Sequence, residues 1–192
     1  MGNAESYGVI LKTENEQFRV TIFDEYKGKV KAIFFGSVSP GMIVRTRMTQ
    51  TTHIPHLQLM EIITAPMLLA RTNIWWFHMI LALIDASVPY GSGIGPLYEQ
   101  LVWLCQHDEA LDKELQMRYC AKIITTLGLQ TVIGRLCTRC MHRLHITSVD
   151  KLTELALDSE CSLRLAEWIT HSIEESIGSS LQFYMQHTHY RE

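Results

Sequence analysis

A change of hydrophobic period at Pro66 limits what this chain can fold into more than any other feature of the sequence. Before Pro66, apolar residues alternate with polar ones in short runs rich in β-branched and aromatic side chains, a pattern typical of strands. After Pro66, apolar residues recur every three or four positions, which is typical of helices. The sequence therefore predicts an α+β protein, with a β domain over residues 1–65 and a helical domain over residues 66–192.

Five strand-like runs separated by turn residues precede Pro66. In the second run, Val20 and Ile22 share one face while Arg19 and Thr21 take the other, so the cation points away from the core. Phe18 falls on the same face as Val20 in this pattern. Five short strands with no helix long enough for a βαβ crossover predict a small OB-type barrel, a fold that commonly binds nucleic acid. The runs cover residues 7–13, 17–23, 29–35, 42–50 and 57–64.

Helical stripes follow Pro66. One face of a helix carries Leu163, Ala166, Ile169, Ile173 and Ile177, with Ser159 as N-cap and Gly178 as stop. The clearest stripe has a spacing of four residues and ends at Gly128, while charged residues that include Arg118 and Lys122 cover its other faces. That stripe consists of Leu111, Leu115, Tyr119, Ile123 and Leu127.

Composition excludes some classes of protein. The net charge is −3, and the region before Pro66 holds seven Lys and Arg against six acids, so the less acidic half is the barrel. The most apolar segment, residues 74–84, is about half the roughly 20 residues that a bilayer span requires, which predicts a buried central helix and no membrane partner. Five cysteines and no signal-like N-terminus predict cytoplasmic thiols or metal ligands.

Cys137 and Cys140 have the two-residue spacing with which paired thiolates hold zinc. A structural zinc needs four ligands, and the nearby candidates for the others are His142, His145 and Cys161. A pair of thiols without metal is the other interpretation of this spacing, so zinc is a hypothesis for Cys137 and Cys140 alone.

No arrangement of residues in the sequence predicts catalysis. The histidines lack a sequence-local nucleophile or carboxylate that would suggest a triad or an acid–base pair. The glycines Gly91, Gly93 and Gly95 do not have the spacing of a phosphate-binding loop, and no strand precedes them, which favours an ordinary interhelical loop. We therefore expect a binding protein rather than an enzyme.

The basic residues of the barrel carry the functional hypothesis. Cations that follow the phosphates and aromatic faces that stack on bases together hold a single strand of nucleic acid. The alternative is a solubilising surface over an aromatic core, and the pattern alone leaves both open. Arg135, Arg139 and Arg143 form a second basic segment. The candidate DNA contacts are Lys12, Arg19, Lys27, Lys29, Lys31, Arg45 and Arg47, and the interleaved aromatics are Tyr7, Phe18, Phe23, Tyr26, Phe34 and Phe35.

Three groups of residues resemble the RecO family of bacterial recombination mediators. The first looks like the family's opening strands, including a turn glycine, Gly28, before a basic strand. The second is similar to its leucine and glycine passage followed by a cysteine pair, and the third to a glycine-containing break near its C-terminus. The order and spacing agree across nearly the whole chain. The segments are 8–13, 19–23 and 28–32 for the first group, 127–129 and 136–140 for the second, and 177–181 for the third.

The resemblance implies an OB-fold domain followed by a helical domain. It also implies DNA repair and recombination activity: binding of single-stranded and double-stranded DNA, annealing of complementary strands, and contacts with a RecR-type protein and a single-stranded DNA-binding protein. Lys12, Arg19, Lys29 and Lys31 match positions in the family's barrel.

Two departures from the family pattern motivate alternatives. The loop at residues 36–41 is short and uncharged, whereas family members carry a longer basic loop, and no second cysteine pair follows Cys140. The main alternative is a protein-interaction scaffold that keeps the architecture and has lost strong DNA binding. A weaker one is a metal-dependent or thiol enzyme that uses Cys137 and Cys140.

Overall fold

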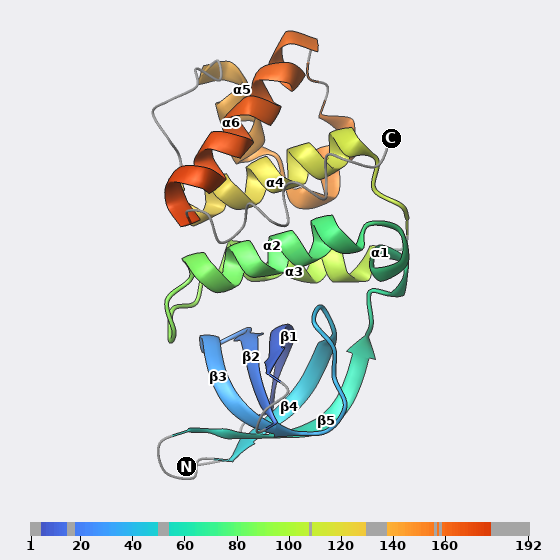
Figure 1. The fold of residues 1–192 in the computed structure, drawn as a ribbon, viewed down its shortest axis with the longest axis vertical. Coiled ribbons are helices and arrows are strands. Elements are labelled where there is room, and N and C mark those ends of the chain that lie inside the picture. Colours follow the sequence, from blue (N-terminus) through green and yellow to red (C-terminus); the bar gives the residue numbers. More distant parts are fainter. Residues whose placement is uncertain are drawn as a thin grey trace.

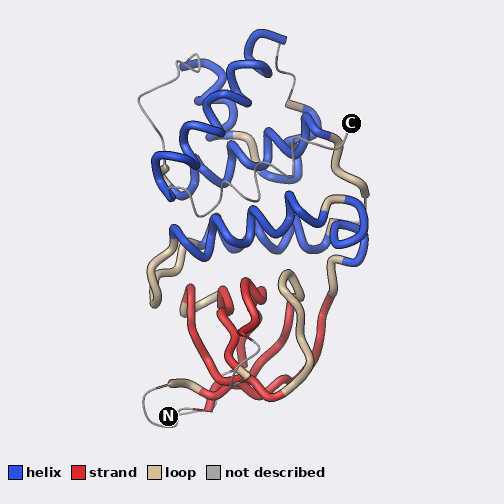
Figure 2. The backbone as a smooth tube through the Cα atoms, viewed as in Figure 1, coloured by secondary structure: helices blue, strands red, loops and turns tan. Residues whose placement is uncertain are grey.

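Strands and helices occupy opposite ends of the molecule (Figure 2). The computed structural model describes residues 5–14, 18–49, 54–107, 109–129, 138–155, 157 and 159–177. Every strand in this part of the chain precedes Pro66, and every helix follows it. The predicted α+β class and the order of its two parts are therefore confirmed.

The strands form one closed barrel, with the order β1-β2-β3-β5-β4 and β4 returning to β1. Neighbouring strands are antiparallel except β3 and β5, which are parallel. All five predicted runs are strands, with ends that differ by a few residues. They are β1 (Glu5–Glu14), β2 (Arg19–Asp24), β3 (Gly28–Phe35), β4 (Ile43–Thr49) and β5 (His56–Thr64).

Alternation along the strands fills the barrel interior with apolar side chains. Val20 and Ile22 point inward as predicted. Ala32 and Phe34 of β3 and Val44 of β4 do the same. Phe18 departs from the pattern because it lies in the turn before β2, where its φ is +53° and its side chain is 65% exposed. The interior cluster consists of Ile10, Val20, Ile22, Ala32, Phe34, Val44 and Leu57.

The helices stack beyond one end of the barrel. Figure 1 shows α2 and α3 lying between the barrel and the helices α4, α5 and α6. The helical elements are α1 (Met67–Thr72), α2 (Ile74–Ser87), α3 (Gly95–Gln106), α4 (Lys113–Leu127), α5 (Thr138–Ile146), the 3₁₀ segment η1 (Val149–Glu154) and α6 (Ser159–Ile177).

The predicted helix features are mostly confirmed. Gly128 ends α4 in the left-handed conformation, with φ of +70°. The apolar segment from Ile74 lies in α2, where Trp76 is buried in the helical core and Trp75 is 40% exposed. Leu163 is an exception, because it is 67% exposed while Leu165 and Trp168 form part of the buried face of α6. None of the described helices combines the length and hydropathy that a membrane span requires.

The middle of β1 belongs to both hydrophobic cores. Ile10 points into the barrel, whereas Val9 and Leu11 point outward and pack with Phe23 and Ile43 in the core of the helical domain. All five side chains are at most 3% exposed. The helical domain therefore covers one outer wall of the barrel, and only the rest of the barrel surface is open to a ligand.

Two cations of α4 are buried rather than spread over an open face. The Nζ of Lys122 donates to the carbonyl oxygens of Leu144 at 3.0 Å and His145 at 2.6 Å, at the end of α5. In the same way, Arg118 Nη1 donates to the carbonyl oxygen of Leu152 in η1 at 3.0 Å. Helix ends leave such carbonyls unpaired and carry partial negative charge, so α4 supplies the caps for the segments that follow it.

Replacement of Lys122 by Met tests this capping role. The side chain is 8% exposed and burial lowers the pKa of its ammonium group, so its two hydrogen bonds are shielded from water. We expect Lys122→Met to lower the free energy of unfolding by about 2–3 kcal/mol in urea titrations. Lys113→Met, at an exposed position of the same helix, is the control and should change it by less than about 0.5 kcal/mol. An equal loss of unfolding free energy in both variants would contradict the capping role of Lys122.

Candidate nucleic-acid interface

The seven predicted DNA contacts do not form one continuous surface. The structure divides them into a group on β1–β3, a group on β4, one buried lysine and one lysine in a turn. The β1–β3 patch is Lys12, Arg19 and Lys31 with Glu14, the β4 ladder is Arg45 and Arg47 with Glu5 and Glu61, and the remaining two residues are Lys29 and Lys27.

Strand register brings the β1–β3 patch together. Lys12 pairs with Thr21, and Thr21 pairs with Lys31, so the two lysines flank one position of β2. Two positions further along, and so on the same face, Glu14 pairs with Arg19. Three cations therefore share a single carboxylate on three adjacent strands, and the patch carries a net charge of +2.

The pKa of Glu14 reflects the positive charges of this patch. Lys31 Nζ donates to its Oε1 at 2.9 Å, and this hydrogen bond is the main cause that holds the pKa of Glu14 below its ordinary value. The charges of Lys12 and Arg19 lower the same pKa further. The side chains of Lys31 and Glu14 are 36% and 30% exposed, so solvent screens this pair, which contributes little to stability and leaves both side chains partly accessible to an anion.

The arginines of the β4 ladder are neutralised by carboxylates. Arg45 Nη2 lies 2.9 Å from Glu61 Oε2, and Arg47 Nη2 lies 2.6 Å from Glu5 Oε1. Arg45 also approaches the second oxygen of Glu5 at 3.9 Å. The ladder has no net charge, and Glu5 and Glu14 are the two ends of β1, so it is separate from the β1–β3 patch.

The expectation that Lys29 points outward to a ligand is wrong. Alternation does place it on the outer face of β3, but that face is covered by the helical domain, and Lys29 is 5% exposed. Its Nζ forms an ion pair with Asp85 of α2 at 2.9 Å and lies over the Tyr90 ring, 4.4 Å from the centroid. Lys29 therefore joins the barrel to the helical domain.

The turn before Lys29 strengthens this junction. Gly28 has φ of +69°, as predicted, and a side chain there would meet the carbonyl oxygen of Ser92 at 1.9 Å. Lys29 N donates to that same carbonyl at 3.2 Å, and Gly91 N donates to Lys29 O at 2.8 Å. The glycine-containing loop between α2 and α3 is thus hydrogen-bonded to the start of β3.

Only part of the aromatic set is exposed. Phe23 and Phe34 are at most 1% exposed and serve as core residues, so the aromatic-core interpretation holds for these two rings. Tyr7, Phe18 and Tyr26 are 42%, 65% and 75% exposed. Phe18 directly precedes Arg19 of the patch. The Phe35 side chain lies outside the described residues, and Lys27 is an exposed turn residue whose Nζ lies 3.0 Å from Met48 Sδ.

Sequence reasoning misses Glu14 as a member of the site. It places Glu14 in the break after the first run, whereas Glu14 is the last residue of β1. The register of β1 against β2 shifts between Ile10 and Lys12, and this irregularity decides which later residues of β1 share a row with Arg19 and Lys31. Gly8, two residues before Ile10, is the one nearby sequence signal for the shift, because a glycine inside a strand pattern often marks a bulge.

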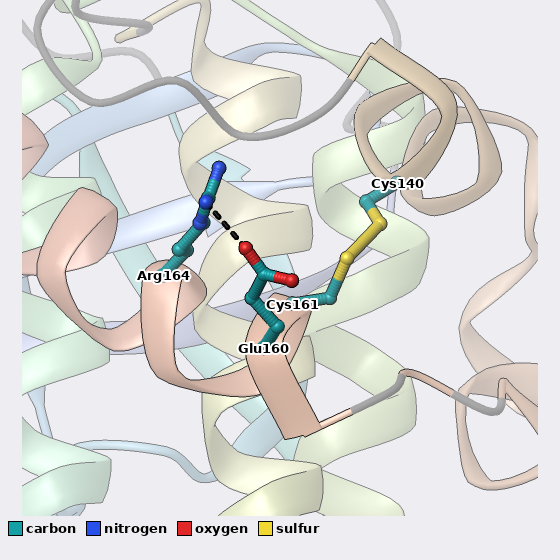
Figure 3. The surroundings of a disulfide bond; sticks show 4 residues. All are labelled: Cys140, Glu160, Cys161 and Arg164. Atoms are coloured by element: carbon teal, nitrogen blue, oxygen red, sulfur yellow. Dashed lines mark hydrogen bonds and ion pairs between the residues drawn. A yellow bond between two sulfur atoms is a disulfide. The ribbon is translucent and has the colours of Figure 1, made fainter.

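The cysteine hypothesis is tested only in part. Cys140 of α5 forms a disulfide with Cys161 of α6, which the sequence named as a candidate zinc ligand (Figure 3). The expectation that the cysteines are thiols or metal ligands is therefore wrong for this pair. Cys137, Arg135 and the Arg139 side chain lie outside the described residues. Within the described residues, no three His, Cys, Asp or Glu side chains gather as metal ligands, so zinc stays a prediction from the spacing.

Neither a scan against protein-family models nor a search of curated proteins finds a match for this chain.

Replacement of Lys29 by Met tests the junction between barrel and helices. Removing one partner of a buried ion pair leaves the other charge uncompensated, which costs about 3–5 kcal/mol in fully buried pairs. Because the Asp85 side chain is 24% exposed, we expect a smaller loss of about 2–3 kcal/mol in urea unfolding. Lys31→Met, two residues along the same strand, removes a partly exposed pair that solvent screens and should cost under about 1 kcal/mol. A larger loss of unfolding free energy in Lys31→Met than in Lys29→Met would show that the Lys29–Asp85 pair does not stabilise the junction.

Proposed function

We propose that this protein binds single-stranded DNA on the β1–β3 patch of an OB-type barrel and acts as a RecO-like recombination mediator. In this proposal the barrel neutralises phosphates and supports annealing of complementary strands. The helical domain docks a RecR-type protein and a single-stranded DNA-binding protein. The proposal requires no covalent chemistry.

The position of the β1–β3 patch is the observation that carries this proposal. OB barrels bind oligonucleotides on the face of their second and third strands and on the loops after the first and fourth strands. Arg19 and Lys31 lie on β2 and β3, and Lys12 lies near the end of β1, before the loop that leads to β2. The patch therefore occupies the part of the barrel where such proteins hold their ligand.

The chemistry of the patch suits a single strand. Each phosphate that a cation neutralises contributes a slope of about −0.7 to the logarithm of the binding constant against the logarithm of salt concentration. Phe18 projects an exposed ring beside Arg19, and stacking of one base on an aromatic ring contributes about 1–3 kcal/mol. Three cations and one ring predict contact with a short stretch of strand and moderate affinity.

A scaffold function is the second candidate, and two observations favour it. The β4 ladder is neutral, so two of the predicted DNA contacts have carboxylate partners already. Apolar side chains are also exposed from β5 to the start of α2, a surface suited to a protein partner. They are Met60, Ile62, Ile63, Met67, Ile74 and Trp75.

Titration of a labelled single-stranded oligonucleotide at several salt concentrations separates the two candidates. We expect the native chain to bind with an affinity that falls as salt rises. The double variant Lys12→Gln, Lys31→Gln should bind about 10- to 30-fold more weakly at 0.1 M salt and lower the slope by about 1.4, since two phosphate contacts are lost. Fluorescence anisotropy gives both quantities.

The matched control is Arg45→Gln, Arg47→Gln, which removes the same charge from the β4 ladder. Its affinity should change less than about threefold, because the ladder lies at the other end of β1 and exposed charges are screened over about 8–10 Å. Equal losses in both variants would mean that only total charge matters. Absent or salt-independent binding by the native chain would favour the scaffold.

Removal of the patch's carboxylate should strengthen binding. Glu14→Gln raises the net charge of the patch from +2 to +3 and replaces the ion pair with Lys31 by a hydrogen bond to a neutral amide oxygen. A charge placed about 7 Å from a phosphate in water contributes roughly 0.6 kcal/mol, so we expect about a threefold gain in affinity. The same anisotropy titration measures it. Weaker binding by Glu14→Gln would show that the carboxylate orders Lys31 for the ligand instead of competing with it.

A further inference from the structure

Two cysteines from different helices meet at the end of the molecule opposite the barrel. Cys140 lies in the first turn of α5 and Cys161 in the first turn of α6, 21 positions apart in the chain, with their Cα atoms 7.1 Å apart (Figure 3). The two residues are 7% and 9% exposed. Figure 1 places both helices far from the strands that carry the β1–β3 patch.

Charged residues lie close to this pair along both helices. Each cysteine has an arginine three residues further along its helix, Arg143 after Cys140 and Arg164 after Cys161. Residues three apart lie on the same side of a helix. The Arg164 side chain is 51% exposed and pairs with Glu160, which is 72% exposed, so polar surface side chains border Cys161.

The other described cysteines differ in reactivity. Cys105 and Cys120 are each 2% exposed in the helical core. Burial raises the pKa of the Cys120 thiol to about 12 and moves that of Cys105 well above its usual range. Because the thiolate is the reactive form, both remain inert at neutral pH and provide an internal control for any oxidation.

We propose that Cys140 and Cys161 are a reversible thiol–disulfide exchange site for low-molecular-weight disulfides of the glutathione class. One cysteine thiolate attacks a sulfur of oxidised glutathione, and one glutathione thiolate leaves. The second cysteine attacks the protein sulfur of the mixed disulfide and displaces the second glutathione. The two protein thiols lose two electrons and two protons in total, and the glutathione disulfide becomes two glutathione thiols.

The disulfide affects the stability of the helical domain because α5 is a short helix. Its nine residues are fewer than the about 12–15 that a helix needs to persist alone, so its order depends on neighbours. Leu144 and the Lys122 cap tie its C-terminal end to α4. The disulfide ties its N-terminal end to α6, and closing this loop lowers the entropy of the unfolded chain. Oxidation therefore stabilises the outer end of the helical domain.

Equilibration of the full chain in glutathione buffers of stepped redox ratio tests the proposal. After acid quenching and alkylation, mass spectrometry should show a loss of two hydrogens and a cross-linked peptide that joins Cys140 to Cys161. Cys105 and Cys120 should be alkylated only after denaturation. The oxidised chain should melt about 5–10 °C above the reduced chain. Cys161→Ser should abolish this shift, whereas Cys120→Ser should retain it.

Three results would overturn the proposal. A cross-link of Cys140 to Cys137, or only mixed disulfides with glutathione, would give the wrong bond. Equal melting temperatures of oxidised and reduced chain would remove its structural effect. One zinc per reduced chain, lost in Cys161→Ser, would make these thiols metal ligands. None of these readouts depends on nucleic-acid binding by the barrel.

Discussion

The sharing of β1 between two hydrophobic cores decides where every charge on the barrel can lie. Ile10 fills the barrel, while Val9 and Leu11, its neighbours on both sides, fill the helical core. Burying each such side chain contributes about 1.5–3 kcal/mol, so this stretch of strand cannot also face water or a ligand. The open part of the outer surface is what remains: the far ends of β1 and the parts of the other strands that the helices do not cover.

This constraint explains why one row of lysines divides into two roles. Lys29 and Lys31 have the same parity on β3 and both point out of the barrel, as strand alternation predicts. Outward at Lys29 means toward α2, where Asp85 and the Tyr90 ring compensate a buried charge. Outward at Lys31 means toward water and Glu14. Alternation determines the side of a sheet, but only the tertiary structure determines what lies on that side.

The need to know the tertiary structure also explains which features could be predicted from the sequence and which could not. The change of period at Pro66, the barrel interior and the Gly128 stop follow from local patterns, and all are found in the structure. The roles of Lys122 and Arg118 do not, because their partners are carbonyls 22 and 34 positions away. Local pattern likewise names Cys161 only as a candidate zinc ligand and does not predict its disulfide with Cys140, since that bond depends on how α5 and α6 pack.

Net charge therefore does not describe the local electrostatics of this chain. The total of −3 argues against a nucleic-acid clamp, yet the β1–β3 patch is +2 within three adjacent strands. Glu14 and Glu5 are nine positions apart on β1, about 30 Å of strand at 3.3 Å per residue, whereas the screening length is about 8 Å at physiological salt. A phosphate at Lys31 thus experiences the patch and little of the β4 ladder. Ionic strength sets the distance over which carboxylates repel a bound anion. Varying it therefore separates the effect of the patch from that of more distant charges.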